Sequence, residues 1–421
     1  MPFNIALSGL NAASTELEVT GNNIANSATN GFKQSRAEFA DVFASSVADL
    51  GTTTTASGVR VADIAQQFSQ GAIDFTSNSL DLAISGGGFF VVADEDGSRA
   101  FTRAGAYSAD RDGFVINSTG QRLQIYEANT DATGTTNFNT GILNDLQLPT
   151  DASSPEPTTS VIAGLNLNST LEQPVDAFDI NNAGSYNSST STTVYDSLGN
   201  PHTATYYFRK TATPNQWDAY LYVDEQPIDV DAGTGDPLPF TLAFDDSGAL
   251  DQAATGVNGD GTVDFTYDPA NGAAPLAFST NFNETTQFGS SFAVNNLTQD
   301  GYASGRLSGV SIDDEGVVFA RYTNGRSAAL GKVALAKFNN TQGLQQIGDN
   351  NWAETFASGQ AQFGEAGTSN FGVIQSGALE GSNVDIAEQL VKLISAQRNY
   401  QANAQVISTA DAIAQTIINI R

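Results

Sequence analysis

The chain contains no cysteine and a single histidine among its 421 residues. Disulfide bonds and thiol nucleophiles are therefore excluded, and so is a zinc site built from several histidine and cysteine ligands. The histidine, His202, lies in the segment Asn200-Pro201-His202-Thr203, and no nucleophile elbow accompanies it that could complete a Ser-His-Asp triad. We expect His202 to be a surface turn residue.

Basic residues are also scarce, since 17 Lys and Arg stand against 46 Asp and Glu and the formal net charge is −29. Such a chain is not expected to bind the phosphate backbone of a nucleic acid. No apolar run reaches the roughly 18 residues that a membrane span needs. The N-terminus, Met1-Pro2-Phe3-Asn4-Ile5, lacks the basic region and continuous apolar core of a Sec signal peptide. If the protein leaves the cell, we expect another export route.

The charge is distributed unevenly along the chain. Residues 145–284 hold 20 acidic and 2 basic side chains, a net charge of −18, whereas residues 1–33 carry a net charge of −1 and residues 383–421 a net charge of 0. The nearly neutral ends can crowd together without like-charge repulsion, while an acidic middle stays solvated and resists unspecific association. An apolar fraction of 40% is enough for packed cores, and 40 glycines favour many short strands and turns.

Both ends of the chain carry apolar residues at alternating spacings of three and four, the heptad pattern of helices that pack on other helices. A first helix is predicted from Asn4 to Ala28, ended by Asn30-Gly31, and a second from Ser382-Asn383 to Asn419, with Ser382 and Asp385 as a capping box. The residues that we expect to mediate self-assembly, here called the predicted seam, are Leu7, Leu10, Leu17, Ile24, Ile386, Leu390, Leu393, Ile394, Tyr400, Val406, Ile413 and Ile417.

Two other arrangements would explain the heptads, namely a helical hairpin within one chain and a stable coiled-coil dimer. Seam positions such as Ser14, Gly21, Gln397 and Asp411 are poor choices for a tight two-stranded zipper. They suit a helix with several different neighbours, as in a tube of many subunits.

Between the helices, the period changes to two, as in Leu80, Leu82 and Ile84, and Asp-Gly turns separate strand-like runs. The segment Ser108–Val115 aligns with Ser311–Val318, so segments that are distant in sequence are predicted to share one β domain. The fold class is therefore α+β and multidomain, with terminal helices in a coiled-coil-like inner domain and mainly-β domains nested as insertions. The predicted domains are a helical assembly domain (1–31 with 383–421), an extended connector (32–70 with 366–382), a β-rich domain (71–144 with 285–365) and an inserted acidic β-rich outer domain (145–284).

No segment carries a convincing catalytic, cofactor or metal motif. Asn258-Gly-Asp-Gly-Thr-Val-Asp264 has the alternation of a calcium loop but lacks the acidic residue at its twelfth position. Gly86-Gly87-Gly88 is not followed by the Gly-Lys-Ser/Thr of a phosphate-binding loop. We expect no enzyme activity, no cofactor, no bound metal and no small-molecule substrate. A secreted β-rich glycan-binding or hydrolytic protein is the alternative from another functional class.

Long motifs in the two terminal blocks resemble one protein family. They are Ser8-Gly-Leu-Asn-Ala-Ala13, Thr20-Gly-Asn-Asn-Ile-Ala-Asn26, Thr29-Asn-Gly-Phe-Lys33, Gln70-Gly71, Leu80-Asp-Leu-Ala-Ile-Ser-Gly-Gly-Gly-Phe-Phe90, Phe101-Thr-Arg-Ala-Gly105, Gln342-Gly-Leu344, Trp352-Ala-Glu-Thr355, Ser376-Gly-Ala-Leu-Glu380, Ser382-Asn-Val-Asp385 and Ala396-Gln-Arg-Asn-Tyr-Gln-Ala-Asn403. Together they closely resemble the bacterial flagellar axial proteins of the rod and hook. Residues 145–284 match this family only loosely.

The resemblance implies a structural subunit that self-assembles into a curved hollow tube, a flexible joint that transmits torque from rod to filament. It favours a hook subunit, because the distal rod component of the family is shorter and has no large insertion; that rod component is the alternative. The implied partners are further copies of the chain, the distal rod protein, the hook cap protein, the hook–filament junction protein and the flagellar type III export apparatus. The implied location is extracellular, in the flagellar hook, reached without a cleaved signal peptide.

Overall fold

The computed structural model describes residues 2–42, 58–130, 135–228, 239–255, 258–368 and 370–419. The chain forms two compact units. Unit 1 comprises residues 1–150, 308–321 and 327–421, and unit 2 comprises residues 151–307 and 322–326. Unit 1 therefore contains both ends of the chain, and unit 2 is inserted between its parts.

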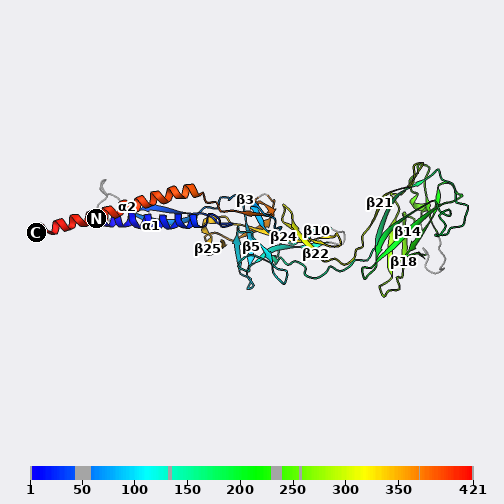
Figure 1. Ribbon diagram of the computed structural model, residues 1–421, viewed down its shortest axis with the longest axis horizontal. Helices are drawn as coiled ribbons and strands as arrows, with labels where there is room; N and C mark the ends of the chain where they lie inside the picture. Colours follow the sequence, from blue (N-terminus) through cyan, green and yellow to red (C-terminus); the bar gives the residue numbers. More distant parts are fainter. Residues whose placement is uncertain are drawn as a thin grey trace. The chain divides into compact units, whose positions relative to one another are not determined.

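Unit 1 contains two long helices, α1 (Pro2–Ala25) and α2 (Ile386–Asn419), which lie side by side and antiparallel (Figure 1). Neither described helix is apolar over the length that a bilayer span requires. The helix α1 ends three residues before the predicted Ala28. The reason is local, because the Asn26 side-chain amide donates to the Asn22 carbonyl at 3.0 Å and the Ser27 hydroxyl to the Ile24 carbonyl at 2.8 Å. These side chains cap the last turn and release the chain into a loop.

The helix α2 begins later than predicted, and its cap is a different residue. The Asp385 carboxylate accepts hydrogen bonds from the backbone N–H groups of Ala387 at 2.8 Å and Glu388 at 3.2 Å. Asp385 is thus the N-cap, whereas the Ser382 hydroxyl accepts a bond only from the Val384 N–H, at 3.3 Å. The predicted capping box of Ser382 and Asp385 is wrong.

The remainder of unit 1 is built from strands. They are β1 (Ser35–Asp41), β2 (Val59–Gln66), β3 (Ile73–Phe75), β4 (Leu82–Ser85), β5 (Phe89–Ala93), β6 (Arg99–Thr102), β7 (Ser108–Ala109), β8 (Val115–Ile116), β9 (Arg122–Thr130), β10 (Thr136–Phe138), β11 (Asn144–Asp145), β22 (Leu307–Ile312), β23 (Val317–Tyr322), β24 (Ser327–Lys337), β25 (Gln345–Gly348), β26 (Asn351–Ala353), β27 (Gln362–Glu365), β28 (Val373–Ser376) and β29 (Ala378–Glu380). Among the described residues, the largest sheet has thirteen strands along the order β22-β23-β24-β9-β5-β6-β26-β25 with five side branches.

Strands that are far apart in sequence meet in this sheet, because β24 pairs antiparallel with both β5 and β9. The two aligned sequence segments also form the same turn. Asp110 accepts hydrogen bonds from the backbone N–H groups two and four residues later, and Asp313 does the same. The glycines of the two turns, Gly113 and Gly316, have φ values of 87° and 82°, a region that disfavours other residues.

The segments predicted as an extended connector, 32–70 and 366–382, form strand pairs. β1 pairs with β2 along the side of α1, β3 pairs with β29, and β4 pairs with β28. The Gly/Ser/Thr-rich stretch at residues 51–58 lies outside the described residues except for Gly58.

Unit 2 is a sandwich of two five-stranded sheets among its described residues. Its strands are β12 (Ser160–Asn168), β13 (Ser188–Tyr195), β14 (Pro201–Lys210), β15 (Gln216–Val223), β16 (Gln226–Ile228), β17 (Phe240–Ala243), β18 (Thr262–Tyr267), β19 (Leu276–Asn281), β20 (Thr286–Phe288) and β21 (Ala293–Gln299). One sheet has the order β18-β19-β12-β20 with β21 on β12, and the other has the order β13-β14-β15-β16 with β17 on β15. Unit 2 extends past the predicted end of the insertion, residue 284, because β20 and β21 both pair with β12.

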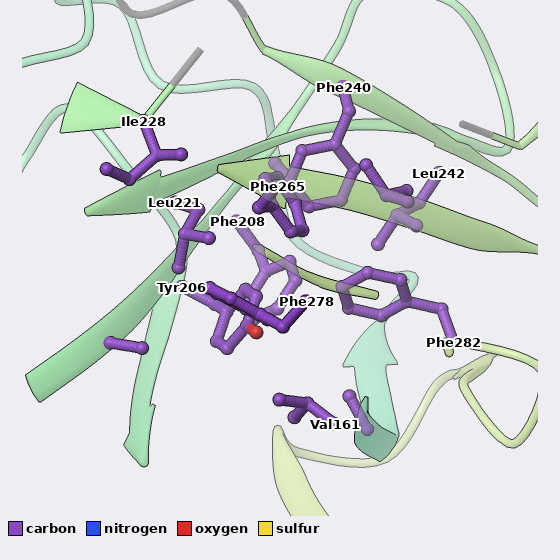
Figure 2. Packing of buried hydrophobic residues seen from close by; sticks show 14 of the residues in the cluster. Val161, Tyr206, Phe208, Leu221, Ile228, Phe240, Leu242, Phe265, Phe278 and Phe282 are labelled. Carbon is purple, nitrogen blue, oxygen red and sulfur yellow. The ribbon is translucent and has the colours of Figure 1, made fainter. Parts of the chain in front are cut away.

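An aromatic core fills the space between the two sheets, and Tyr206, Phe208, Phe265, Phe278 and Phe282 gather there (Figure 2). The polar atoms of two buried aromatic residues in this core have partners in the opposite sheet. The Tyr206 hydroxyl lies 2.7 Å from the Thr280 hydroxyl. The Trp217 indole N–H donates to the Gln287 side chain at 2.6 Å. Because burying an unpaired polar group is costly, these bonds fix the relative position of the sheets.

The prediction that His202 is a surface turn residue is wrong. His202 lies in β14 and is only 8% exposed. Side chains alternate along a strand, and Ala204, Tyr206 and Phe208 on the same face of β14 are all buried. The alternation therefore carries His202 inward with them.

Candidate assembly site

The side chains that α1 and α2 bury completely are small or polar among the described residues. The buried positions of α1 include Ala6, Ala13 and Thr20, which are seven residues apart, and those of α2 include Gln389 and Ala396, also seven apart. The helices approach closely here. A Cβ atom on Gly9 would lie 2.8 Å from the side-chain oxygen of Asn403, and the Asn23 amide donates to the Gln389 side chain at 3.2 Å.

The predicted seam is a different set of positions, and the structure buries none of its described side chains completely. Leu10, Leu17, Ile24 and Leu393 are partly buried. The others are exposed, with exposed fractions of 42% for Leu7, 50% for Ile386, 46% for Leu390, 48% for Ile394, 38% for Tyr400, 47% for Val406 and 56% for Ile413. Ile417 lies on α2, but its side chain is outside the described residues. The helical hairpin within the chain thus leaves most of these large apolar residues exposed, chiefly on α2.

The exposed apolar surface includes a groove of about 720 Å³ between the start of α1 and the second half of α2. Phe3 lines it from α1, and Ala402, Val406, Ala410 and Ile413 line it from α2. Charge is sparse along the described parts of both helices. One of the few ion pairs, between Glu388 and Lys392 at 2.7 Å, lies at the start of α2, away from this groove.

A buried ionic cluster joins the base of the helices to the β part of unit 1. The Lys33 Nζ atom lies 2.6 Å from one carboxylate oxygen of Glu380, and an Arg103 guanidinium nitrogen lies 3.0 Å from the other. The side chains of Lys33 and Glu380 are fully buried, and that of Arg103 is 6% exposed. Burial lowers the pKa of Lys33 below its usual value, and the charge of Glu380 opposes this shift.

Backbone groups complete the cluster. Lys33 donates to the carbonyl of Ser69 at 2.7 Å, Arg103 donates to the carbonyl of Gly86 at 2.8 Å, and the Gly71 N–H donates to Glu380 at 2.9 Å. Two cations and one anion therefore hold together five segments of the chain, around residues 33, 69–71, 86, 103 and 380.

A second set of contacts between the helices and the β structure of unit 1 is made by amide side chains. Asn23 on α1 exchanges two hydrogen bonds with the backbone of Ser35, at 2.8 and 2.9 Å. Asn383, just before α2, accepts a bond from the Gln34 N–H at 2.8 Å and donates to the Gln67 carbonyl at 2.7 Å. These two asparagines imitate strand pairing at the points where each helix meets β1 and β2, so they fix where the helices leave the β structure.

A third contact attaches β2 to the core of the large sheet. The Trp352 indole N–H donates to the Gln66 side chain at 2.6 Å, and the Trp352 ring packs edge-on against Phe68 and Phe89, with ring centroids 5.5 and 5.7 Å away.

Most of the residues in these three contacts lie inside the motifs that resemble the rod and hook family, and the motifs alone assign them no role. Lys33, Arg103 and Glu380 are charged residues inside motifs that are otherwise rich in small and apolar residues. That contrast is the signal that could have identified them, since an isolated charge in a buried segment needs a partner.

The acidic turns form no cluster of three metal-ligating side chains among the described residues. In the segment most like a calcium loop, Asp260 accepts a hydrogen bond from the Thr262 N–H at 2.9 Å, and Asp264 accepts one from the Asn258 amide at 3.0 Å. These carboxylates therefore organise the turn itself.

Comparison with known protein families gives four matches along the chain. They are the flagella basal body rod protein family over residues 3–33, the flagellar hook protein FlgE/F/G D1 domain over residues 83–159, the flagellar basal body protein FlaE D2 domain over residues 166–302, and the flagellar basal body rod FlgEFG protein C-terminal family over residues 375–420.

Whole proteins align over the full length as well. The flagellar hook protein FlgE of Salmonella typhimurium is 41% identical over 427 residues, covering 100% of both chains, and that of Escherichia coli has the same identity and coverage. The crystal structure of Helicobacter pylori flagellar hook protein FlgE2 superimposes with a TM-score of 0.53, covering 73% of this chain and 100% of that chain. At 16% sequence identity, this last likeness concerns the fold alone.

Proposed function

The chain belongs to the flagellar hook protein FlgE family, and we propose that it assembles through the uncovered apolar faces of α1 and α2 into a curved hollow tube that acts as a flexible joint and transmits torque from the rod to the filament. It is a structural subunit of the flagellar hook, a polymeric component of the flagellum. Full-length agreement with hook proteins favours this function over that of the distal rod component.

The observation that carries the assembly proposal is the uncovered half of the helix pair. The side chains of Ile386, Leu390 and Ile394 are in contact with water in the free subunit. Their burial against another copy would stabilise the assembly by about 25 cal/mol per Å² of apolar surface removed from water. Because the ends of the chain carry almost no net charge, helices of neighbouring copies can pack on these faces without repulsion. The predicted seam residues would then lie between subunits rather than within one.

The domains have a corresponding division of roles in this proposal. Residues 1–31 and 383–421 form the inner tube, residues 32–70 and 366–382 connect it to the β-rich part, and residues 145–284, most of which belong to unit 2, form the outer domain. The partners are further copies of the chain, the distal rod protein, the hook cap protein, the hook–filament junction protein and the type III export apparatus. The location is extracellular, and the chain performs no catalysis.

Electron microscopy of the assembled protein tests the proposal, because curved hollow tubes are expected and their absence under all polymerising conditions would contradict it.

Helix content is expected to rise on assembly. The buried α1–α2 contact consists mainly of small side chains, so it buries little apolar surface and stabilises the helices weakly in a free subunit. Circular dichroism of the same protein as a monomer and as a polymer measures the change. A variant that cannot polymerise, kept under polymerising conditions, is the control for the effect of the buffer. Equal helicity of monomer and polymer would contradict this expectation.

Removal of most of unit 2 is expected to leave polymerisation intact and to change curvature. Ser153 and Gly305 pair as an isolated bridge, with the Ser153 N–H donating to the Gly305 carbonyl at 2.7 Å, so the chain enters and leaves unit 2 side by side. A short Gly-Ser link can therefore replace residues 154–304 without opening unit 1.

The variant should form straighter tubes whose assembly depends less on salt, because the deleted segment carries 19 acidic and only 2 basic residues. Electron microscopy gives the curvature, and sedimentation at several salt concentrations gives the assembly. If the shortened protein is folded and soluble but never polymerises, unit 2 supplies essential contacts.

A further inference from the structure

Three turns of unit 2 meet around its single histidine. The first connects β13 to β14 and contains Asp196, the second connects β15 to β16 and contains Asp224, and the third connects β18 to β19 and contains Asn271. His202 lies among them near the start of β14 and is 8% exposed.

Both ring nitrogens of His202 face carboxylates. Its Nδ1 atom lies 2.6 Å from an oxygen of Asp224, and its Nε2 atom lies 3.3 Å from an oxygen of Asp196. A neutral imidazole has one N–H donor and one acceptor, and an acceptor cannot bond a carboxylate oxygen. The geometry therefore fits the protonated ring, in which both nitrogens donate. Among the described residues, His202 is the only cationic side chain within 4.0 Å of either carboxylate.

The two carboxylates hold the turns to which they belong. Asp196, whose side chain is fully buried, accepts hydrogen bonds from the Leu198 N–H at 2.9 Å and the Asn200 N–H at 2.8 Å, and from the Asn271 amide of the third turn at 2.7 Å. Asp224 accepts a bond from the Thr203 N–H at 2.9 Å. The protonated ring of His202 therefore connects the first two turns, and the bond from Asn271 to Asp196 attaches the third turn to the same group.

The remaining titratable neighbours are few. The Tyr267 ring of β18 packs edge-on against the imidazole with centroids 5.4 Å apart, and its hydroxyl lies 3.5 Å from Asp224. Glu225 follows Asp224 in the second turn, and Asp268 follows Tyr267 in the third. All of these groups are acidic, so the field around His202 favours its charged form.

The balance of burial and bonding agrees with this geometry. Burial lowers the pKa of His202, but the hydrogen bonds and charges of Asp224 and Asp196 outweigh it and raise the pKa above its usual value of 6.5. A histidine with a raised pKa in the folded state contributes stability that is fully present below 6.5 and is lost as the pH rises through the folded-state pKa.

We propose that protonated His202 is a pH-sensitive clamp that joins these three turns, and that loss of its proton loosens this end of unit 2 while the rest of the sandwich stays folded. The clamp would make the order of this end of unit 2 depend on the pH of the surrounding solution.

The experiment uses the full-length, untagged subunit, in which the only histidine signal belongs to His202. Nuclear magnetic resonance should show the ring titrating with a midpoint above 6.5. Amide exchange, corrected for the intrinsic effect of pH, should show protection of Leu198, Asn200 and Thr203 falling at least tenfold through the same midpoint. Protection of core amides such as Phe208 should not change. A ring midpoint at or below 6.5, or protection that is independent of pH, would overturn the proposal.

Two variants separate the clamp from a general effect of pH. Asp224→Asn should lower the histidine midpoint, and asparagine tolerates the φ of 49° at this position. His202→Gln should abolish the pH dependence of protection in the three turns. Asp245→Asn is the matched control, because Asp245 organises a similar turn in unit 2 through the Ser247 and Ala249 N–H groups without a histidine. A control that shifts the histidine midpoint as much as Asp224→Asn does would also contradict the proposal.

Discussion

Glu380→Gln should lower the melting temperature of unit 1 by about 10 °C. The substitution keeps the size of the side chain but removes the only anion of the buried cluster, so Lys33 and Arg103 remain as two uncompensated cations. Breaking a buried ion pair by removing one partner costs about 3–5 kcal/mol. In a unit of this size, each kcal/mol corresponds to about 2–4 °C.

Differential scanning calorimetry of the monomeric subunit measures the effect, with the transition of unit 2 as an internal reference. Glu315→Gln is the matched control. Its carboxylate is 74% exposed and lies 3.7 Å from Lys332, so its loss should move the transition by no more than a degree or two. A Glu380→Gln transition as small as that of the control would mean that the cluster does not hold unit 1 together.

The terminal helices and their approximate extent were predictable because a heptad is a local pattern. Their ends were less so, since they depend on individual hydrogen bonds. Asn26 and Ser27 stop α1 early, and Asp385 rather than Ser382 caps α2. Propensity alone does not distinguish between neighbouring residues that are all good caps.

The repeated Asp-Gly turns were predictable for the same local reason, and the match between the segments around Asp110 and Asp313 appears as two equivalent turns. The boundary of the insertion was not predictable, because β20 and β21 join unit 2 by pairing with β12, more than a hundred residues earlier. The hydrophobic pattern of a strand sets which of its faces is buried, but it does not show with which distant strand it pairs.

The contacts that attach the helices to the β structure of unit 1 could not be predicted from the sequence, because the residues that make them are far apart along the chain. Lys33 and Glu380 are separated by 347 positions, and Asn23 and Gln389 by 366. The prediction for His202 was wrong for a different reason. The preceding Asn200-Pro201 suggested a turn, but the alternation through Ala204, Tyr206 and Phe208 decides the position of the ring. A period-two count starting at His202 would have placed it inward.

The heptad pattern also does not show which of two sets of residues packs within the chain. α1 and α2 carry two heptad sets, the small one at Ala6, Ala13 and Thr20 and the large one of the predicted seam. Small residues allow the closer approach and are used within the chain, as Gly9 against Asn403 illustrates. The period of a pattern says that a face will be covered, but not whether the cover comes from the same chain or from another copy.

Ile394→Asp and Leu10→Asp should each abolish polymerisation and leave the subunit folded. Ile394 is 48% exposed and Leu10 is partly buried, so a carboxylate at either position can reach water in the free subunit. In the proposed helical tube the same carboxylate would be buried without a partner, at a cost on the order of several kcal/mol. Since each 1.4 kcal/mol is a factor of about ten in affinity, the concentration needed for assembly should rise at least a hundredfold.

Sedimentation under polymerising conditions measures the loss, and circular dichroism with thermal unfolding shows whether the subunit is intact. Ser395→Asp and Asn11→Asp are the matched controls, because each adds the same charge one residue further along the same helix, at exposed positions. Successive helical residues point about 100° apart, so the controls test the face rather than the charge. If both members of a pair assemble alike, the predicted seam does not lie between subunits. If only the seam variants fail, the faces left open by the helical hairpin are the ones that neighbouring copies cover.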